Sequence, residues 1–196
     1  MNFLEYKDKI ICASKYYTVD EMIKIHQLGI NHFGENYVQD LIYKKNQLKD
    51  TNIIWHLIGH LQRNKVKQVI NEIEYFHALD SIKLAKEIQK YRKEPLKCFI
   101  ELNLSRDVSK HGIFEEELNQ MIQEIKNYDK IIVIGLMAMG KYNDLSETEN
   151  IFSKLVELKH KYQLPMVSMG MSDDYEIAIK YHSDFLRIGS LFKGVI

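Results

Sequence analysis

Residues 166–174 read MVSMGMSDD, and residues 185–194 read FLRIGSLFKG. In each stretch a short apolar run ends in a glycine beside a serine, and the first stretch then enters a helical pattern. Backbone N–H groups at such a turn and helix start suit a phosphate dianion, because the helix dipole favours negative charge there. The two turns therefore predict a phosphate site. Its expected contacts are Ser168, Gly170, Ser172, Gly189 and Ser190, with Ser172 alternatively a simple helix N-cap.

These two turns follow the last two of eight strand-like runs. The runs cover residues 9–14, 31–34, 53–59, 75–79, 97–104, 131–139, 166–168 and 184–188. Helical patterns lie between them, and strict alternation of this kind favours a parallel sheet with helices outside. Eight units predict a single α/β domain over residues 1–196, folded as a (β/α)8 TIM barrel. An open doubly wound sheet is the main alternative. In such barrels the loops after strands 7 and 8 commonly hold phosphate.

Polar residues ahead of the apolar helical patterns predict where several helices begin. Thr18-x-x-Glu21 and Ser146-x-x-Glu149 read as capping boxes, and Ser81 precedes another helix.

The chain looks short for this architecture, because barrels of this type run to about 250 residues. Only eight residues precede the first strand-like run. We therefore expect the N-terminal helix to be missing or reduced to one turn. The seam between strands 8 and 1 would then be covered by a partner chain or by Phe3, Leu4 and Tyr6. Both a monomer and a homodimer are compatible with this expectation.

Lys15 is the main candidate for covalent chemistry. Barrel closure would place strand 8 beside strand 1, which ends in Ser14-Lys15, so the lysine would stand next to the phosphate turns. That is the layout for holding an aldehyde-bearing phosphate cofactor as a Schiff base. Arg187 shares a strand face with Phe185 and would neutralise a phosphate or hydrogen-bond a ring nitrogen. The alternatives are a solvated lysine at a loop start and a structural ion pair of the arginine.

Three further polar residues fall at strand ends. His56 and His60 flank the end of strand 3, where one reading is a metal pair. We expect no metal there, because the two positions belong to strand and loop and no third ligand is apparent. The favoured reading is that His60 lines the pocket mouth, or that both are core histidines. Asn36 is placed to face the pocket or to cap the next helix, and the two roles are compatible.

Composition limits the remaining function classes. Lys+Arg and Asp+Glu both number 27, so the chain has no net positive charge that would favour binding to nucleic acid. The local cluster Arg63, Lys65 and Lys67 reads as a solvated helix face. Cys12 and Cys98 lie in apolar runs and read as reduced core thiols. No signal peptide or transmembrane run appears, so we expect a cytoplasmic protein without membrane contact.

Seven strings together resemble the pyridoxal phosphate homeostasis protein family. They are ASK (13–15), HFGENYVQ (32–39), WHLIGHLQRNKVK (55–67), SKHGI (109–113), GLMAMG (135–140), SMGMSDDYEIAI (168–179) and RIGS (187–190). The resemblance spans residues 9–194. Members look like the isolated barrel domain of fold-type III enzymes such as alanine racemase.

The resemblance implies that Lys15 holds pyridoxal 5′-phosphate (PLP) as a Schiff base. It places Arg187 near the pyridine nitrogen, and the 168–172 loop with Gly189 and Ser190 at the phosphate. Asn36 and His60 approach the ring or the pocket rim. Two departures stand out: Tyr16-Tyr17-Thr18 replaces a frequent Thr-Lys-Pro, and Leu191-Phe192-Lys193 replaces a small-then-apolar tail. We expect both to alter the pocket rim.

Three functions follow from these patterns. The favoured one is intracellular PLP homeostasis, in which the protein holds, buffers or delivers PLP to apo-enzymes without catalytic turnover. The second is an amino-acid racemase of the alanine racemase type, which needs an acid/base residue from another domain. The third is a phosphosugar enzyme without PLP, which would need a base such as Glu35 or Glu101.

Overall fold

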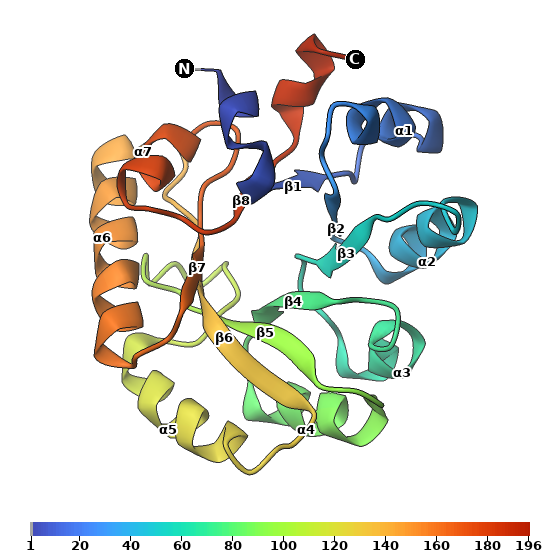
Figure 1. Ribbon diagram of the computed structural model, residues 1–196. Helices are drawn as coiled ribbons and strands as arrows, with labels where there is room; N and C mark the ends of the chain where they lie inside the picture. The colour runs from blue at the N-terminus through green and yellow to red at the C-terminus, as the bar shows by residue number, and fades with distance from the viewer. Residues whose placement is uncertain (1) are drawn as a thin grey trace.

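The computed structural model describes residues 2–196 as eight parallel strands surrounded by helices (Figure 1). The strands are β1 (Ile10–Ala13), β2 (His32–Glu35), β3 (Ile54–Leu57), β4 (Tyr75–Leu79), β5 (Leu96–Glu101), β6 (Ile131–Met137), β7 (Met166–Ser168) and β8 (Leu186–Ile188). Each overlaps a strand-like run of the sequence, because continuous apolar stretches suit strands that are covered on both faces. The eight predicted strands are therefore confirmed.

The strands form a ring rather than an open sheet. Their order is β7-β6-β5-β4-β3-β2-β1-β8, and β8 pairs with β1 through Ile10–Leu186 and Cys12–Ile188. A single parallel bridge between Ser168 and Phe185 joins β7 to β8. Closure confirms the (β/α)8 barrel and excludes the doubly wound alternative.

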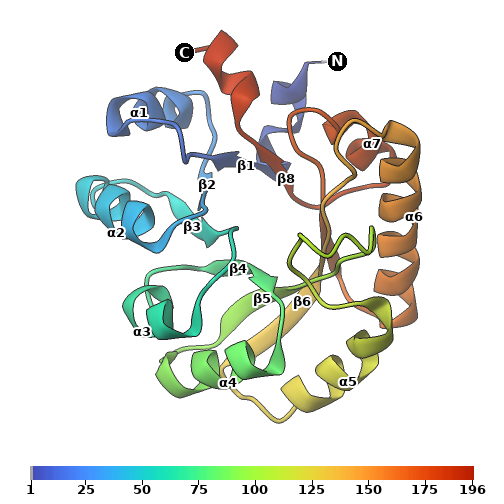
Figure 2. The same cartoon turned by 180° about the vertical axis from the view of Figure 1, so that it is seen from behind.

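The helices pack around the outside of this ring (Figure 2). They are α1 (Val19–Gln27), α2 (Val38–Gln47), α3 (Val66–Val69), α4 (Ile82–Tyr91), α5 (Glu115–Ile125), α6 (Leu145–Lys161) and α7 (Tyr175–Lys180), with 3₁₀ helices η1 (Phe3–Lys9), η2 (Arg63–Lys65) and η3 (Ser190–Gly194). Their buried apolar faces form the outer core against the strands. Within residues 2–196, no helix is both long and apolar enough to cross a membrane.

Helix starts agree with the sequence at two positions and differ at three. The Thr18 capping box and the Ser81 N-cap are present. The predicted Ser146 box is wrong: α6 begins earlier, where the Asp144 side chain accepts from Glu147 N at 2.9 Å. The left-handed turn at Asn143 (φ 55°) redirects the chain ahead of Asp144, an equally good cap residue. Asn36 and Ser172 are not caps either, because α2 and α7 are preceded by Tyr37 and Asp174.

A short N-terminal segment lies beside the seam where β8 meets β1. In place of a full α-helix, η1 brings the Phe3 ring against the Phe192 ring of η3, with centroids 5.2 Å apart in an edge-to-face arrangement. Phe192 is fully buried, and both termini lie near β1 and β8 in Figure 1. The expected reduction is present, but not to one turn, because η1 runs over seven residues with a kink at Tyr6. Phe192, one of the residues that depart from the family pattern, gives the short segment η1 an apolar partner with which to cover the seam between β8 and β1.

Candidate functional site

The carboxyl ends of β1, β7 and β8 meet at one side of the barrel mouth. The Ser172 hydroxyl, in the loop after β7, accepts from Gly189 N at 3.2 Å, and Arg187 N donates to Gly170 O at 2.8 Å. The two predicted phosphate turns therefore touch each other. Gly170 has a φ of +95°, and a Cβ placed there would lie 2.5 Å from the Ala178 Cβ, so this turn requires glycine.

Lys15 follows β1 at the same side of the mouth. Its side chain is exposed, and its Nζ lies 4.6 Å from the centre of the Tyr16 ring. Lys193 Nζ, from η3, lies 5.8 Å from the same ring. Lys15 therefore stands near the residues that follow β8, as barrel closure predicted, but none of its described contacts reaches Arg187.

Tyr17 fastens the loop after β1 to the loop after β8. Its hydroxyl donates to Gly189 O at 2.7 Å, and the side chain is buried. Burial raises the pKa of Tyr17 to about 12, so the hydroxyl stays protonated as a donor at neutral pH. Tyr17, one of the residues that depart from the family pattern, therefore joins two loops of the proposed site.

Arg187 points into the barrel rather than into solvent. Its Nη1 donates to Ser168 Oγ at 2.7 Å and its Nη2 donates to Ala138 O at 3.2 Å. Burial lowers the Arg187 pKa, while the carboxyls of Asp174 and Glu101 act in the opposite direction. The predicted phosphate contact Ser168 is fully buried, so its hydroxyl serves Arg187 within the interior.

Glu101, at the end of β5, shares this interior. Burial, reinforced by the nearby Asp80 charge and opposed by Arg187, raises its pKa to about 7. Asp174 also has a raised pKa because it is buried. The site therefore combines one buried guanidinium with two carboxyls that bind protons more tightly than usual.

The loops after β2 and β3 form the next part of the rim, because β2 pairs with β1. Asn36 and His60, both predicted site residues, line a hollow of about 360 Å³ together with Gly59, Gln62 and Lys65. Gly59 packs closely there: a Cβ would lie 2.5 Å from Asn36 O. The structure brings Asn36 and His60 together in this hollow, whose described lining includes no residue of the phosphate turns.

His56 and His60 do not form a metal pair. His56 is fully buried in the barrel, whereas the exposed His60 accompanies Asp80 and His111, with possible ligand atoms within 4.8 Å of one another. The His60 and His111 rings are stacked 3.9 Å apart and 7° from parallel. Imidazole lone pairs lie in the ring plane, so rings stacked in this way do not direct two nitrogens at one ion.

Three buried or half-buried polar residues that the sequence analysis did not single out lie in or against the barrel. His77 and His32 contact His56 inside the barrel, and Lys44 pairs with the buried Glu35 beneath Ser14. A polar residue within an otherwise apolar strand run was the available signal for the histidines. Lys44 gave no such signal, because a lysine next to Lys45 on an outer helix is ordinarily expected to be exposed to solvent.

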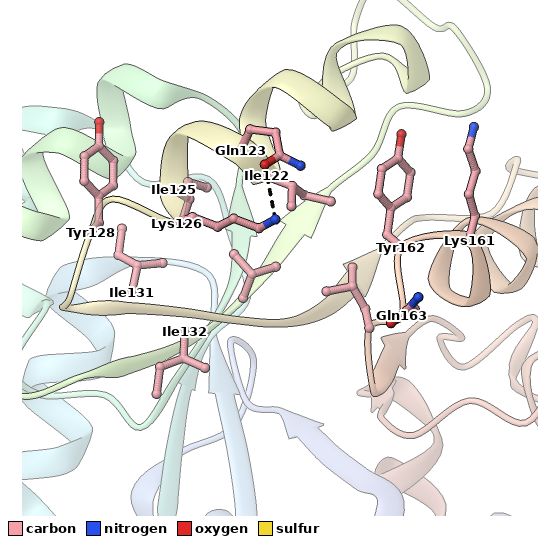
Figure 3. Close-up of a pocket in the computed structure, with 12 residues that line it drawn as sticks. Ile122, Gln123, Ile125, Lys126, Tyr128, Ile131, Ile132, Lys161, Tyr162 and Gln163 are labelled. Atoms are coloured by element: carbon pink, nitrogen blue, oxygen red, sulfur yellow. Dashed lines mark hydrogen bonds between the residues drawn. The ribbon is translucent and has the colours of Figure 1, made fainter.

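A second groove, of about 560 Å³, lies outside the barrel between the ends of α5 and α6 (Figure 3). Ile122, Ile132, Tyr128 and Tyr162 are among its lining residues. It is formed around the start of β6 and the residues ahead of β7, at the end of the barrel opposite the site.

Comparison with known proteins identifies the family of this chain. The family model described as "Alanine racemase, N-terminal domain" matches residues 5–195. The Pyridoxal phosphate homeostasis protein of Haemophilus influenzae is 35% identical, covering 95% of this chain and 84% of that protein. The mouse protein of the same name is 34% identical, covering 95% and 76%. The chain belongs to the pyridoxal phosphate homeostasis protein family.

Solved structures support the same family fold. PipY of Synechococcus elongatus PCC7942, solved with PLP bound, superposes with a TM-score of 0.87 at 26% identity, covering 95% of this chain and 92% of that one. Alanine racemase of Corynebacterium glutamicum has a TM-score of 0.73 at 16% identity, covering 97% of this chain and 56% of that one. That second likeness shows a shared barrel alone.

Proposed function

We propose that this protein binds PLP and serves in its homeostasis, holding, buffering or delivering the cofactor. The observation that carries the proposal is the pairing of β1 with β8. It sets Lys15 beside loops that are already joined through Ser172 and Gly189, with Arg187 buried below them. Relatives named for PLP homeostasis and the PLP-bound PipY structure support it.

Each residue has a distinct role in this proposal. Lys15 supplies the primary amine, and bound PLP supplies an aldehyde able to condense with it. Gly170, Ser172, Gly189 and Ser190 hold the phosphate, with Ser168 beneath them as the support of Arg187. Arg187 is the residue that would donate a hydrogen bond to the pyridine nitrogen of bound PLP. A charged donor at that position would disfavour protonating the nitrogen, and the ring would then be a weak electron sink, as suits storage rather than turnover. Asn36 and His60 form the rim.

The test is a titration of the protein with PLP, followed by absorption spectroscopy. Wild type should acquire a visible Schiff-base band, Lys15→Ala should not, and the exposed-lysine control Lys24→Ala should behave as wild type. Equal bands in Lys15→Ala and wild type would refute the assignment. Delivery is tested by mixing loaded protein with an apo PLP enzyme, whose activity should appear faster than with the same concentration of free PLP.

Racemisation remains the competing function, because the matching family model is that of an alanine racemase domain. It is distinguished by solvent exchange of the α-hydrogen of free L- and D-alanine. Slow exchange that is independent of Lys15 supports a binding protein. Rapid exchange that is lost in Lys15→Ala would assign an enzyme.

A further inference from the structure

Three histidines cross the barrel interior as one hydrogen-bonded series, here called the histidine column. His32 Nδ1 lies 2.8 Å from His56 Nε2, and His56 Nδ1 lies 2.9 Å from His77 Nε2. His77 Nδ1 lies 2.9 Å from the Ser168 hydroxyl, which accepts from Arg187. The column thus runs from the first residue of β2 to the guanidinium in the proposed cofactor site.

The donor direction along the column follows from Arg187. A guanidinium only donates, so the Ser168 oxygen accepts from it. The only other contact described for this hydroxyl is His77 Nδ1, to which it therefore donates. A neutral imidazole that accepts at Nδ1 carries its proton on Nε2, which donates to His56 Nδ1. The same rule makes His56 donate from Nε2 to His32 Nδ1.

The two inner histidines are held neutral by their surroundings. Burial lowers the pKa of His56, and the neighbouring His77 and His32 lower it further. Burial also lowers the pKa of His77, followed by the Arg187 charge and His32. Phe185 and Phe99 pack against the His77 ring, with centroids 5.7 and 4.5 Å away. The carboxyls near Arg187 are those of Glu101 and Asp174.

All three imidazoles then turn a lone pair towards Arg187 and an N–H away from it. Aligned in this way, hydrogen bonds polarise one another, and their negative ends face the buried cation. We infer that the histidine column positions Arg187: it holds Ser168 as a dedicated acceptor and so fixes the guanidinium that would contact the pyridine ring of bound PLP. The inference about the ring rests on the proposed function; the coupling of Arg187 to the column does not.

The coupling is tested without PLP, by ¹⁵N NMR of histidine-labelled protein. His32, His56 and His77 should each show the Nε2–H tautomer in wild type. In Arg187→Ala, Ser168 no longer needs to accept from a guanidinium, and the Nδ1–H form of His77 should appear. Nδ1–H tautomers in wild type, or three unchanged histidines in Arg187→Ala, would overturn the inference.

The effect on the site is tested by PLP affinity and band position in three variants. His77→Phe removes the acceptor of Ser168 and should weaken binding about tenfold, the scale of one hydrogen bond to a charged group. Ser168→Ala should do the same with less risk to folding. His77→Asn keeps an acceptor oxygen near the Nδ1 position and should restore most of the affinity and the wild-type band. The exposed His160→Phe is the control.

The outcomes separate this inference from the proposed function. If His77→Phe and Ser168→Ala bind as wild type does, the column does not position Arg187 for the ligand. Weak binding by folded His77→Asn equal to that of His77→Phe would also count against it. If wild type itself acquires no PLP band, the proposed function fails, whereas the tautomers still decide whether Arg187 and the column are coupled.

Discussion

At the scale of single residues, the buried ion pair beneath Lys15 shows how the site is held. Lys44 Nζ lies 2.6 Å from Glu35 Oε1 and also donates to Ser14 O at 2.7 Å. The Ser14 hydroxyl donates to the same carboxylate oxygen at 2.8 Å. Glu35 has no exposed surface, and its Oε2 lacks a hydrogen-bond partner among the described residues. Lys44 is therefore the cation that makes this buried carboxylate tolerable.

Replacing Lys44 with methionine should lower the free energy of unfolding by about 3–5 kcal/mol, because it leaves a buried carboxylate unpaired. Urea denaturation measures this. The matched control is Lys154→Met, whose amine pairs with Glu115 and Glu157 on the surface and should change stability by about 0.5 kcal/mol or less. A Lys44→Met protein as stable as its control would show that the Lys44–Glu35 pair does not stabilise the fold.

Glu101 should make the stability of the ligand-free protein depend on pH. Its folded pKa of about 7 exceeds the ordinary value of 4.5, so the folded state holds the proton more tightly. The resulting stability is complete below pH 4.5 and is lost as the pH rises through 7. Glu101→Gln keeps the neutral form, so its stability relative to wild type should rise between pH 5 and pH 8, by roughly 3 kcal/mol at most. An equal difference at both pH values would contradict this.

At the scale of elements, the loop after β7 depends on one backbone conformation. Gly170→Ala adds a side chain at φ +95° and 2.5 Å from Ala178. We expect a loss of about 1–3 kcal/mol in unfolding free energy and weaker PLP binding. Gly194→Ala is the matched control, because no atom lies within 4 Å of its added Cβ. Equal stability of the two variants would mean that the turn relaxes freely.

The elements also show how far sequence reasoning reaches. Strands such as β6 and helix starts such as Thr18 follow from apolar runs and local capping chemistry, which a few neighbouring residues determine. The start of α6 was misplaced because two acceptable caps, Asp144 and Ser146, lie two residues apart, and the turn at Asn143 decides between them. The two predicted phosphate turns contact each other through the Ser172–Gly189 bond.

The histidine column lay beyond prediction for a different reason. His32, His56 and His77 are more than 20 residues apart in sequence, and their contacts depend on the stagger of three neighbouring strands. The inward direction of each side chain was readable from strand alternation, but its height in the barrel was not. The burial of Ser168 beside Arg187 escaped prediction because it depends on the same stagger.

At the scale of the whole molecule, closing the ring brings the two ends of the chain together. β1 and β8 pair, η1 packs on η3 through Phe3 and Phe192, and Tyr17 bonds to Gly189. The proposed cofactor site is built across this junction, so its assembly requires a closed barrel. Loss of closure would separate Lys15 from both phosphate turns.

The most direct test of this account is borohydride reduction of the PLP-loaded protein, followed by peptide mass mapping. The account predicts one reduced adduct, on Lys15, even though Lys193 lies beside the same Tyr16 ring. An adduct on Lys193, or adducts spread over surface lysines, would contradict the assignment of Lys15 and with it the proposed site.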